Sequence, residues 1–171
     1  GHLPDLSDGP PAKLARSAAA GAPIGSAGPL GRLLVRGEQG HDFVPELRPL
    51  SCEHVIDKPG YGAFHKTTLG ALLGAFGIRR LLLCGVTTEV CVHSTLREAI
   101  DRGFVCTTVG DATAASQPEL QAPALAMIGV EGGIFGRVLD TDAVLAEWGA
   151  SGASAVPPDR VSTWMNAYTG A

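Results

Sequence analysis

The sequence has no apolar run approaching the roughly 20 residues that a helix needs to cross a bilayer, and no signal-peptide pattern. Its basic residues form no cluster and the formal net charge is −4, which argues against a nucleic-acid partner. The cysteines lack the CxxC or Cys/His spacing of a zinc site; they are Cys52, Cys84, Cys91 and Cys106. These absences predict a cytoplasmic protein with reduced thiols, no membrane contact, no metal and no cofactor.

The composition, 45% hydrophobic and 18% charged over 171 residues, suits one α/β domain with a proper core. Apolar runs that predict strands alternate with segments of helical periodicity. The predicted strands are 33–35 (weak), 53–58, 78–84, 104–109 and 133–138, and the predicted helices are 67–76, 88–102, 118–129 and 141–148. This alternation predicts right-handed βαβ units in a three-layer α/β/α fold around a mostly parallel, Rossmann-like sheet.

Both ends of the chain lack periodicity. Residues 1–31 are rich in Gly, Pro, Ala and Ser, which predicts a long surface excursion. We expect the domain to occupy residues 1–148 and to lack its first strand and helix, because no buried strand is predicted before residue 32. Residues 149–171 predict a loose tail, whose Trp164, Met165 and Tyr168 are candidates to dock on a partner subunit.

The segment from Cys84 to Ser94 is the strongest candidate for an active site. It follows the apolar run Leu81–Leu83 and turns at Gly85. A predicted helix then begins, with Cys91 in its first turn. Unpaired N–H groups and the positive end of a helix dipole favour a thiolate at such a position. A buried structural thiol is the alternative interpretation of Cys91.

Lys58 and the Val86-Thr87 pair are further candidates. Lys58 precedes Pro-Gly at the end of a predicted strand, so its ammonium either reaches Cys91 or is solvated. The preceding residue, Asp57, is expected to point to the opposite face of the sheet. Thr87 or Thr88 suits a helix N-cap. The functional alternative is that the backbone N–H groups of Thr87 and Cys91 form an oxyanion hole.

Two further groups of residues suggest weaker hypotheses. One hypothesis is a metal site formed by His2, Asp5 and Asp8. Because their loop is rich in Gly and Pro, the preferred interpretation is that they are solvated turn residues. The remaining histidines have no ligand spacing. Cys84 and Cys91 could act together in a thiol redox protein, although a strand end and a helix start need not face each other.

Several motifs, in order, resemble the isochorismatase-like cysteine hydrolases. IDKPG (56–60), GVTTEVCV (85–92) and REAIDRG (97–103) carry the resemblance, which covers residues 1–136. GHLPDLSDGPPAK (1–13) and GPLGRLLVRGEQGHDFVPEL (28–47) are similar to the branch containing biuret hydrolase and related carbamoyl-amide hydrolases. The presence of Cys91 argues against a true isochorismatase. The Gly- and Pro-rich loop at the start of the sequence lacks the His-rich zinc site of nicotinamidases.

The resemblance implies an Asp–Lys–Cys triad in which Lys58 is the lysine and Cys91 the nucleophile. It also implies a non-proline cis peptide before Thr87, and substrate contacts by Phe64 and by Glu131, where the branch carries Gln. The triad aspartate lies on the family's first strand and has no counterpart in these 171 residues.

The resemblance further implies hydrolysis of a small carbamoyl or urea-like amide through a thioester, by a homo-oligomer, typically a tetramer. One alternative is a catalytically impaired homologue serving as a pseudoenzyme or assembly subunit. The other is the redox protein using Cys91 and Cys84.

Overall fold

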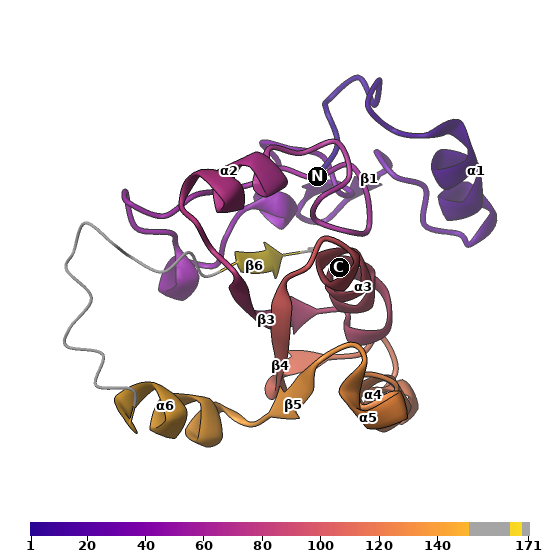
Figure 1. The fold of residues 1–171 in the computed structure, drawn as a ribbon. Helices are drawn as coiled ribbons and strands as arrows, with labels where there is room; N and C mark the ends of the chain where they lie inside the picture. The colour runs from indigo at the N-terminus through magenta and orange to yellow at the C-terminus, as the bar shows by residue number, and fades with distance from the viewer. Residues whose placement is uncertain (151–164, 169–171) are drawn as a thin grey trace.

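A parallel sheet forms the centre of the computed structural model, which describes residues 1–150 and the strand 165–168. The strand order is β5-β4-β3-β6, and all three pairs are parallel. The strands are β3 (Arg80–Val86), β4 (Val105–Ala114), β5 (Arg137–Leu139) and β6 (Met165–Tyr168). Helices lie on both faces of the sheet (Figure 1). The predicted α/β class with a parallel sheet is therefore confirmed.

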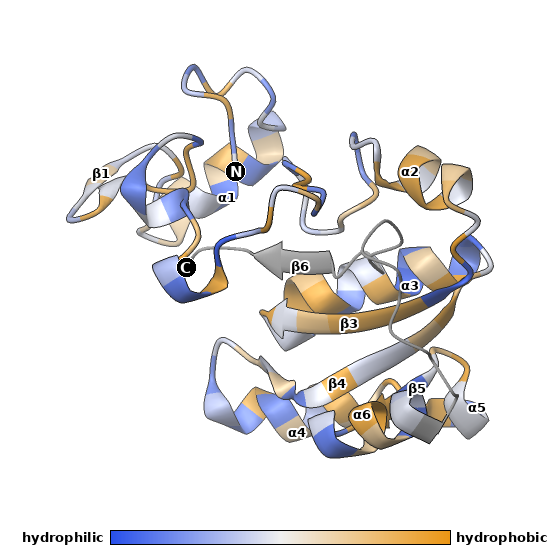
Figure 2. Cartoon of the chain, turned by 90° about the vertical axis from the view of Figure 1, so that its left-hand side faces the viewer, coloured by the Kyte–Doolittle hydropathy of each residue, from blue (hydrophilic) through white to orange (hydrophobic). Residues whose placement is uncertain are grey.

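The helices connect the strands in the order expected of βαβ units. They are α2 (Leu69–Ala75), α3 (His93–Asp101), α4 (Pro118–Ala126), α5 (Val130–Gly133) and α6 (Thr141–Ala150). Helix α3 lies along β3, whose residues are largely apolar (Figure 2). Among the described residues, no helix is long and apolar enough to cross a membrane.

One buried cluster holds the sheet and its helices together. Leucines of α2, β3 and α3 belong to it together with Cys106 of β4, and Leu96 and Ile128 are completely buried. The other leucines of the cluster are Leu69, Leu73, Leu81 and Leu83. The i, i+4 spacing of Leu69 and Leu73 puts both side chains on one face of α2, which explains the helical periodicity that predicted a helix at 67–76.

Several predicted boundaries were wrong. Residues 53–58 form no strand, because no neighbouring segment of the described chain pairs with them, and Val55 is 55% exposed. Residues 33–35 contribute only an isolated bridge between Val35 and His2. The segment 133–138 begins as the end of α5, and the strand starts only at Arg137. Strand formation depends on a partner, which a local apolar pattern does not specify.

The segment 1–31 is more ordered than its composition predicted. It contains α1 (Pro11–Ala19) and one arm of a small antiparallel pair, β1 (Ala27–Gly28) with β2 (Gly31–Arg32). Proline at the first helical position fits the start of α1, since its fixed φ is already helical and its missing N–H is not needed there. Short 3₁₀ turns follow at Gln39–His41 and Pro45–Leu47.

The predicted tail, residues 149–171, falls mostly outside the described residues. Trp164 lies outside them, as do the side chains of Met165 and Tyr168, so docking on a partner stays a prediction. The backbone of 165–168 pairs with β3, from Leu83 with Met165 to Val86 with Tyr168. This strand therefore adds to the sheet beside β3.

Burial of the Cys106 thiol makes stability sensitive to alkaline pH. Burial raises the pKa of Cys106 from 9.0 to about 11, so the folded chain keeps a proton that the unfolded chain releases above pH 9. The resulting stability is present below pH 9 and is lost as the pH rises through 11, by at most about 2–3 kcal/mol. Denaturant unfolding between pH 8.5 and 10.5 should show a smaller decline for Cys106→Ala than for wild type. Parallel declines would show that Cys106 does not titrate in this way.

Candidate active site

Cys91 lies just beyond the carboxyl end of β3, where α/β proteins commonly bind ligands. It is 5% exposed and belongs to a π-helical turn, η3 (Thr88–Val92), that precedes α3. The amide of Val92 donates to the Thr87 carbonyl at 3.1 Å, the i→i+5 bond of a π turn. The sequence predicted one continuous helix here, because local sequence periodicity does not identify a single π turn within a helix.

Two hydroxyl groups fix this turn from either side. Thr88, fully buried, donates to the Gln121 side-chain carbonyl at 2.7 Å, which links η3 to α4. Thr95 donates to the Cys91 carbonyl at 2.8 Å and accepts from the Ala63 amide at 3.1 Å. Thr87 occupies the N-cap position, as one of the two alternatives predicted, but makes no side-chain cap bond. The threonines hold the turn to its surroundings instead.

The peptide bond between Val86 and Thr87 is cis, at the position where the resemblance implies one. Thr87 lines the same pocket as Cys91, whereas Val86 ends β3. The Thr87 carbonyl accepts the amides of Val90 and Val92 and so points back into the turn.

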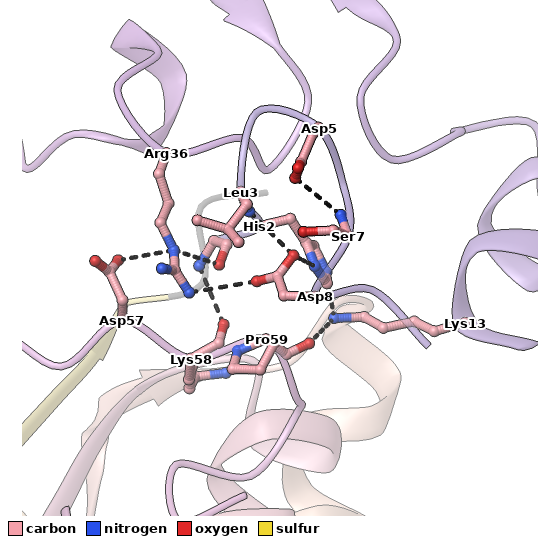
Figure 3. A network of polar contacts seen from close by, with 11 residues as sticks. His2, Leu3, Asp5, Ser7, Asp8, Lys13, Arg36, Asp57, Lys58 and Pro59 are labelled. Atoms are coloured by element: carbon pink, nitrogen blue, oxygen red, sulfur yellow. Dashed lines mark hydrogen bonds and ion pairs between the residues drawn. The ribbon is translucent and has the colours of Figure 1, made fainter. Parts of the chain in front are cut away.

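Lys58 is buried, at 8% exposure, and its ammonium faces Cys91. It donates to the carbonyls of Gly60 at 3.0 Å and Tyr61 at 2.8 Å. Burial lowers the pKa of Lys58, and interaction with the Cys91 sulfur opposes that shift. Among the described residues, no carboxylate contributes to this balance. Asp57 pairs instead with Arg36 at 3.5 Å, is half-exposed and is not among the residues that line the pocket of Cys91 (Figure 3).

Cys91 and Lys58 open into one pocket of about 190 Å³. Residues distant in sequence line it: Gly1, His2, Lys13, Leu34, His41, Lys58, Gly60, Tyr61, Thr87, Val90 and Cys91. The pocket is large enough for a small organic molecule but not for a folded protein segment.

The pocket contains residues that the sequence did not assign to the site, above all His2 and Lys13. His2 is 1% exposed, so the expectation of a solvated turn residue is wrong for it. Its ring lies between Asp8, at 3.2 Å from Nδ1, and Lys13, at 2.9 Å from Nε2 (Figure 3). Asp5 does fit the turn interpretation, because its carboxylate accepts the Ser7 amide at 3.0 Å. The described residues contain no group of three or more potential metal ligands.

The structure does not bring Phe64 or Glu131 into this pocket. Phe64 is a core residue that stacks on Phe104, with 5.9 Å between ring centroids. Glu131 is exposed in α5, with a left-handed backbone at φ 50° and ψ 40°. Substrate contact by either residue therefore stays a prediction.

The cysteines show no oxidised pair in the described part of the chain; all four are free thiols. Cys84 is half-buried, and burial raises the pKa of its thiol. A thiol held in its protonated form is a poor attacking group, so this observation disfavours Cys84 as a resolving partner for Cys91.

Comparisons with known proteins agree on one family. A family model described as the isochorismatase domain matches residues 15–143. Ureidoacrylate amidohydrolase RutB from Serratia proteamaculans is 38% identical over 113 residues, which cover 66% of this chain and 45% of that protein. The chain spans about half the length of the curated relatives it matches.

Solved structures give the same result. An isochorismatase-like hydrolase from Alkaliphilus metalliredigens is 32% identical, with a TM-score of 0.64, covering 72% of this chain and 65% of that one. An N-carbamoylsarcosine amidase from Thermoplasma acidophilum is 28% identical, with a TM-score of 0.57, covering 66% of this chain and 62% of that one.

Proposed function

Since this chain belongs to the isochorismatase family, we propose that it is a cysteine-dependent amidohydrolase that cleaves a C–N bond of a small carbamoyl or ureido amide. The observation that supports this most directly is the meeting of Lys58 and Cys91 in one small pocket. The names of two similar proteins give ureidoacrylate and N-carbamoylsarcosine as substrates, and both are ureido acids. A neutral, biuret-like substrate is the other member of the proposed class.

In the proposed reaction, the Cys91 sulfur adds to the carbonyl carbon of the substrate. The Lys58 ammonium offsets negative charge first on the sulfur and then near the developing oxyanion, while the backbone N–H groups of Thr87 and Cys91 donate to that oxygen. The proton given up by the Cys91 thiol passes to the leaving nitrogen, ammonia or an amine departs, and a thioester remains on Cys91. Water then cleaves the thioester and restores the thiol.

Ammonia release from N-carbamoylglycine and from biuret tests this proposal. We expect hydrolysis of at least one of them with kcat/KM of about 10⁴ M⁻¹s⁻¹ or more, the lower end of the usual enzyme range. Intact-mass spectrometry during turnover should detect an acyl adduct on Cys91. An adduct without ammonia turnover would favour the catalytically impaired homologue. Loss of two free thiols under mild peroxide, without hydrolysis, would favour the redox protein.

Homo-oligomer formation is part of the same proposal and comes from the family resemblance. Light scattering on the purified chain measures it directly, and a mass of four chains is the expected result.

A further inference from the structure

The pocket around Cys91 has a charge opposite to that of the whole chain. The net charge is −4, yet two of the three lysines, Lys13 and Lys58, line this one pocket, and the third is Lys66. No Asp or Glu side chain is among its described lining residues. Burial lowers the pKa of Lys13 and the neighbouring Lys58 lowers it further, whereas Cys91 and Asp8 act in the opposite direction. Two ammonium groups held this close favour an anionic ligand.

In the proposed reaction Lys58 has no donor left for such a ligand. Its ammonium has three N–H groups, of which two are bound to the carbonyls of Gly60 and Tyr61. In the proposed reaction the third N–H group serves the Cys91 sulfur, which lines the same pocket. A negatively charged group elsewhere on a substrate therefore needs a different cation to bind it.

Lys13 has a donor available. Its ammonium donates to the Pro59 carbonyl at 2.7 Å and to His2 Nε2 at 2.9 Å (Figure 3). Among the described residues these two bonds use two of its three N–H groups. The Tyr61 ring, whose centroid is 4.9 Å from Nζ, flanks the same ammonium. Lys13 is thus anchored beside Lys58 at the pocket wall with one N–H group uncommitted.

The anchoring of Lys13 depends on a buried, neutral imidazole. Asp8 accepts from His2 Nδ1 at 3.2 Å, which leaves the lone pair of Nε2 to accept from Lys13. Burial, followed by the charge of Lys13, lowers the pKa of His2, consistent with the neutral ring. Asp8 is itself fixed by the Leu3 amide at 3.0 Å and by Arg36 at 3.4 Å.

From this geometry we propose that Lys13 is a specificity-determining residue that binds a carboxylate of the substrate, with His2 and Asp8 as its positioning residues. This inference rests on the proposed amidohydrolase function and narrows it to carbamoyl or ureido acids, in preference to neutral amides such as biuret. The single N–H group left on Lys13 forms a charge-assisted hydrogen bond with the carboxylate while Cys91 attacks the ureido carbonyl.

A matched pair of substrates tests the inference. N-carbamoylglycine and its primary amide differ mainly in the charge of one terminal group, and loss of the carbamoyl group can be followed by mass spectrometry. We expect wild type to prefer the acid by more than tenfold in kcat/KM, and Lys13→Met to reduce that preference by about 10- to 100-fold. Lys13→Arg should restore part of it, and Lys66→Met should leave it unchanged.

His2→Leu tests the positioning role with the same ratio. It removes the acceptor at Nε2, so we expect a reduced acid preference with an unchanged rate of iodoacetamide alkylation at Cys91. A ratio of two kcat/KM values in one preparation does not depend on the folded fraction, so partial unfolding cannot imitate this result. Equal losses on both substrates in Lys13→Met, together with slower alkylation, would overturn the inference and assign Lys13 to Cys91 instead.

Calorimetry separates the inference from the proposed function. N-carbamoylglycine is titrated into Cys91→Ala protein, with and without Lys13→Met, so that binding is measured without turnover. We expect Lys13→Met to weaken binding by at least tenfold. Equal affinities, or no binding to either protein, would refute the carboxylate contact. Binding that depends on Lys13 without hydrolysis by wild type would refute only the proposed reaction.

Discussion

Replacement of Cys91 by alanine should lower kcat/KM for ammonia release by at least about 10³-fold, because the proposed mechanism has no other nucleophile. Cys91→Ser should be similarly impaired, since a hydroxyl beside Lys58 is a far weaker nucleophile than a thiolate. The acyl adduct seen by mass spectrometry should disappear with either change. The measurement is steady-state ammonia release at saturating and limiting substrate, with circular dichroism as the test of folding.

Cys52→Ser is the matched control for the cysteine variants. Cys52 is exposed and is not among the pocket residues, so its replacement should leave kcat/KM within about twofold of wild type. A folded Cys91→Ala protein that keeps the wild-type rate would refute the nucleophile assignment and the thioester together.

Lys58→Met should lower kcat/KM by about 10²–10³-fold, the usual effect of removing one group that stabilises the transition-state charge. Methionine has a similar length but no charge, so the Cys91 sulfur loses the ammonium that faces it. We therefore expect slower alkylation of Cys91 by iodoacetamide in the same variant. Both rates should be measured at one pH near neutrality, on protein whose melting temperature is known.

The melting temperature matters because Lys58 also stabilises the folded chain. Its replacement leaves the carbonyls of Gly60 and Tyr61 without their donor, which costs about 1–3 kcal/mol if they remain buried. Lys66→Met, at an exposed site outside the pocket, controls for the loss of one lysine. Lys58→Met protein that stays folded and active within twofold of wild type would exclude Lys58 from the reaction.

Features predicted from neighbouring residues agreed best with the structure. The apolar run ending at Cys84 became β3, and the leucines spaced i, i+4 after Thr67 became one face of α2. Both depend on short-range periodicity, which burial of one face selects directly. The prediction of a strand at 53–58 was wrong because its apolar residues have no adjacent strand to pair with in the described chain.

His2 and Lys13 show the limit of the same reasoning. The two residues are 11 positions apart, and the Pro59 carbonyl that completes the anchoring of Lys13 is another 46 positions along the chain. No repeat or motif spacing connects such residues. A Gly- and Pro-rich opening segment therefore predicted only turns, although it contributes a buried wall of the pocket.

The sequence by itself determined the class of the fold and the chemical types at the site, namely a cysteine after an apolar strand and a lysine before Pro-Gly. Local backbone preference and the burial of apolar runs suffice for that. Only the tertiary structure decided which groups share the pocket: His2 and Lys13 lie within it, and Phe64 and Glu131 do not. The physical reason is that burial and charge at a site depend on distances between remote segments, and those distances are fixed only when the layers pack together.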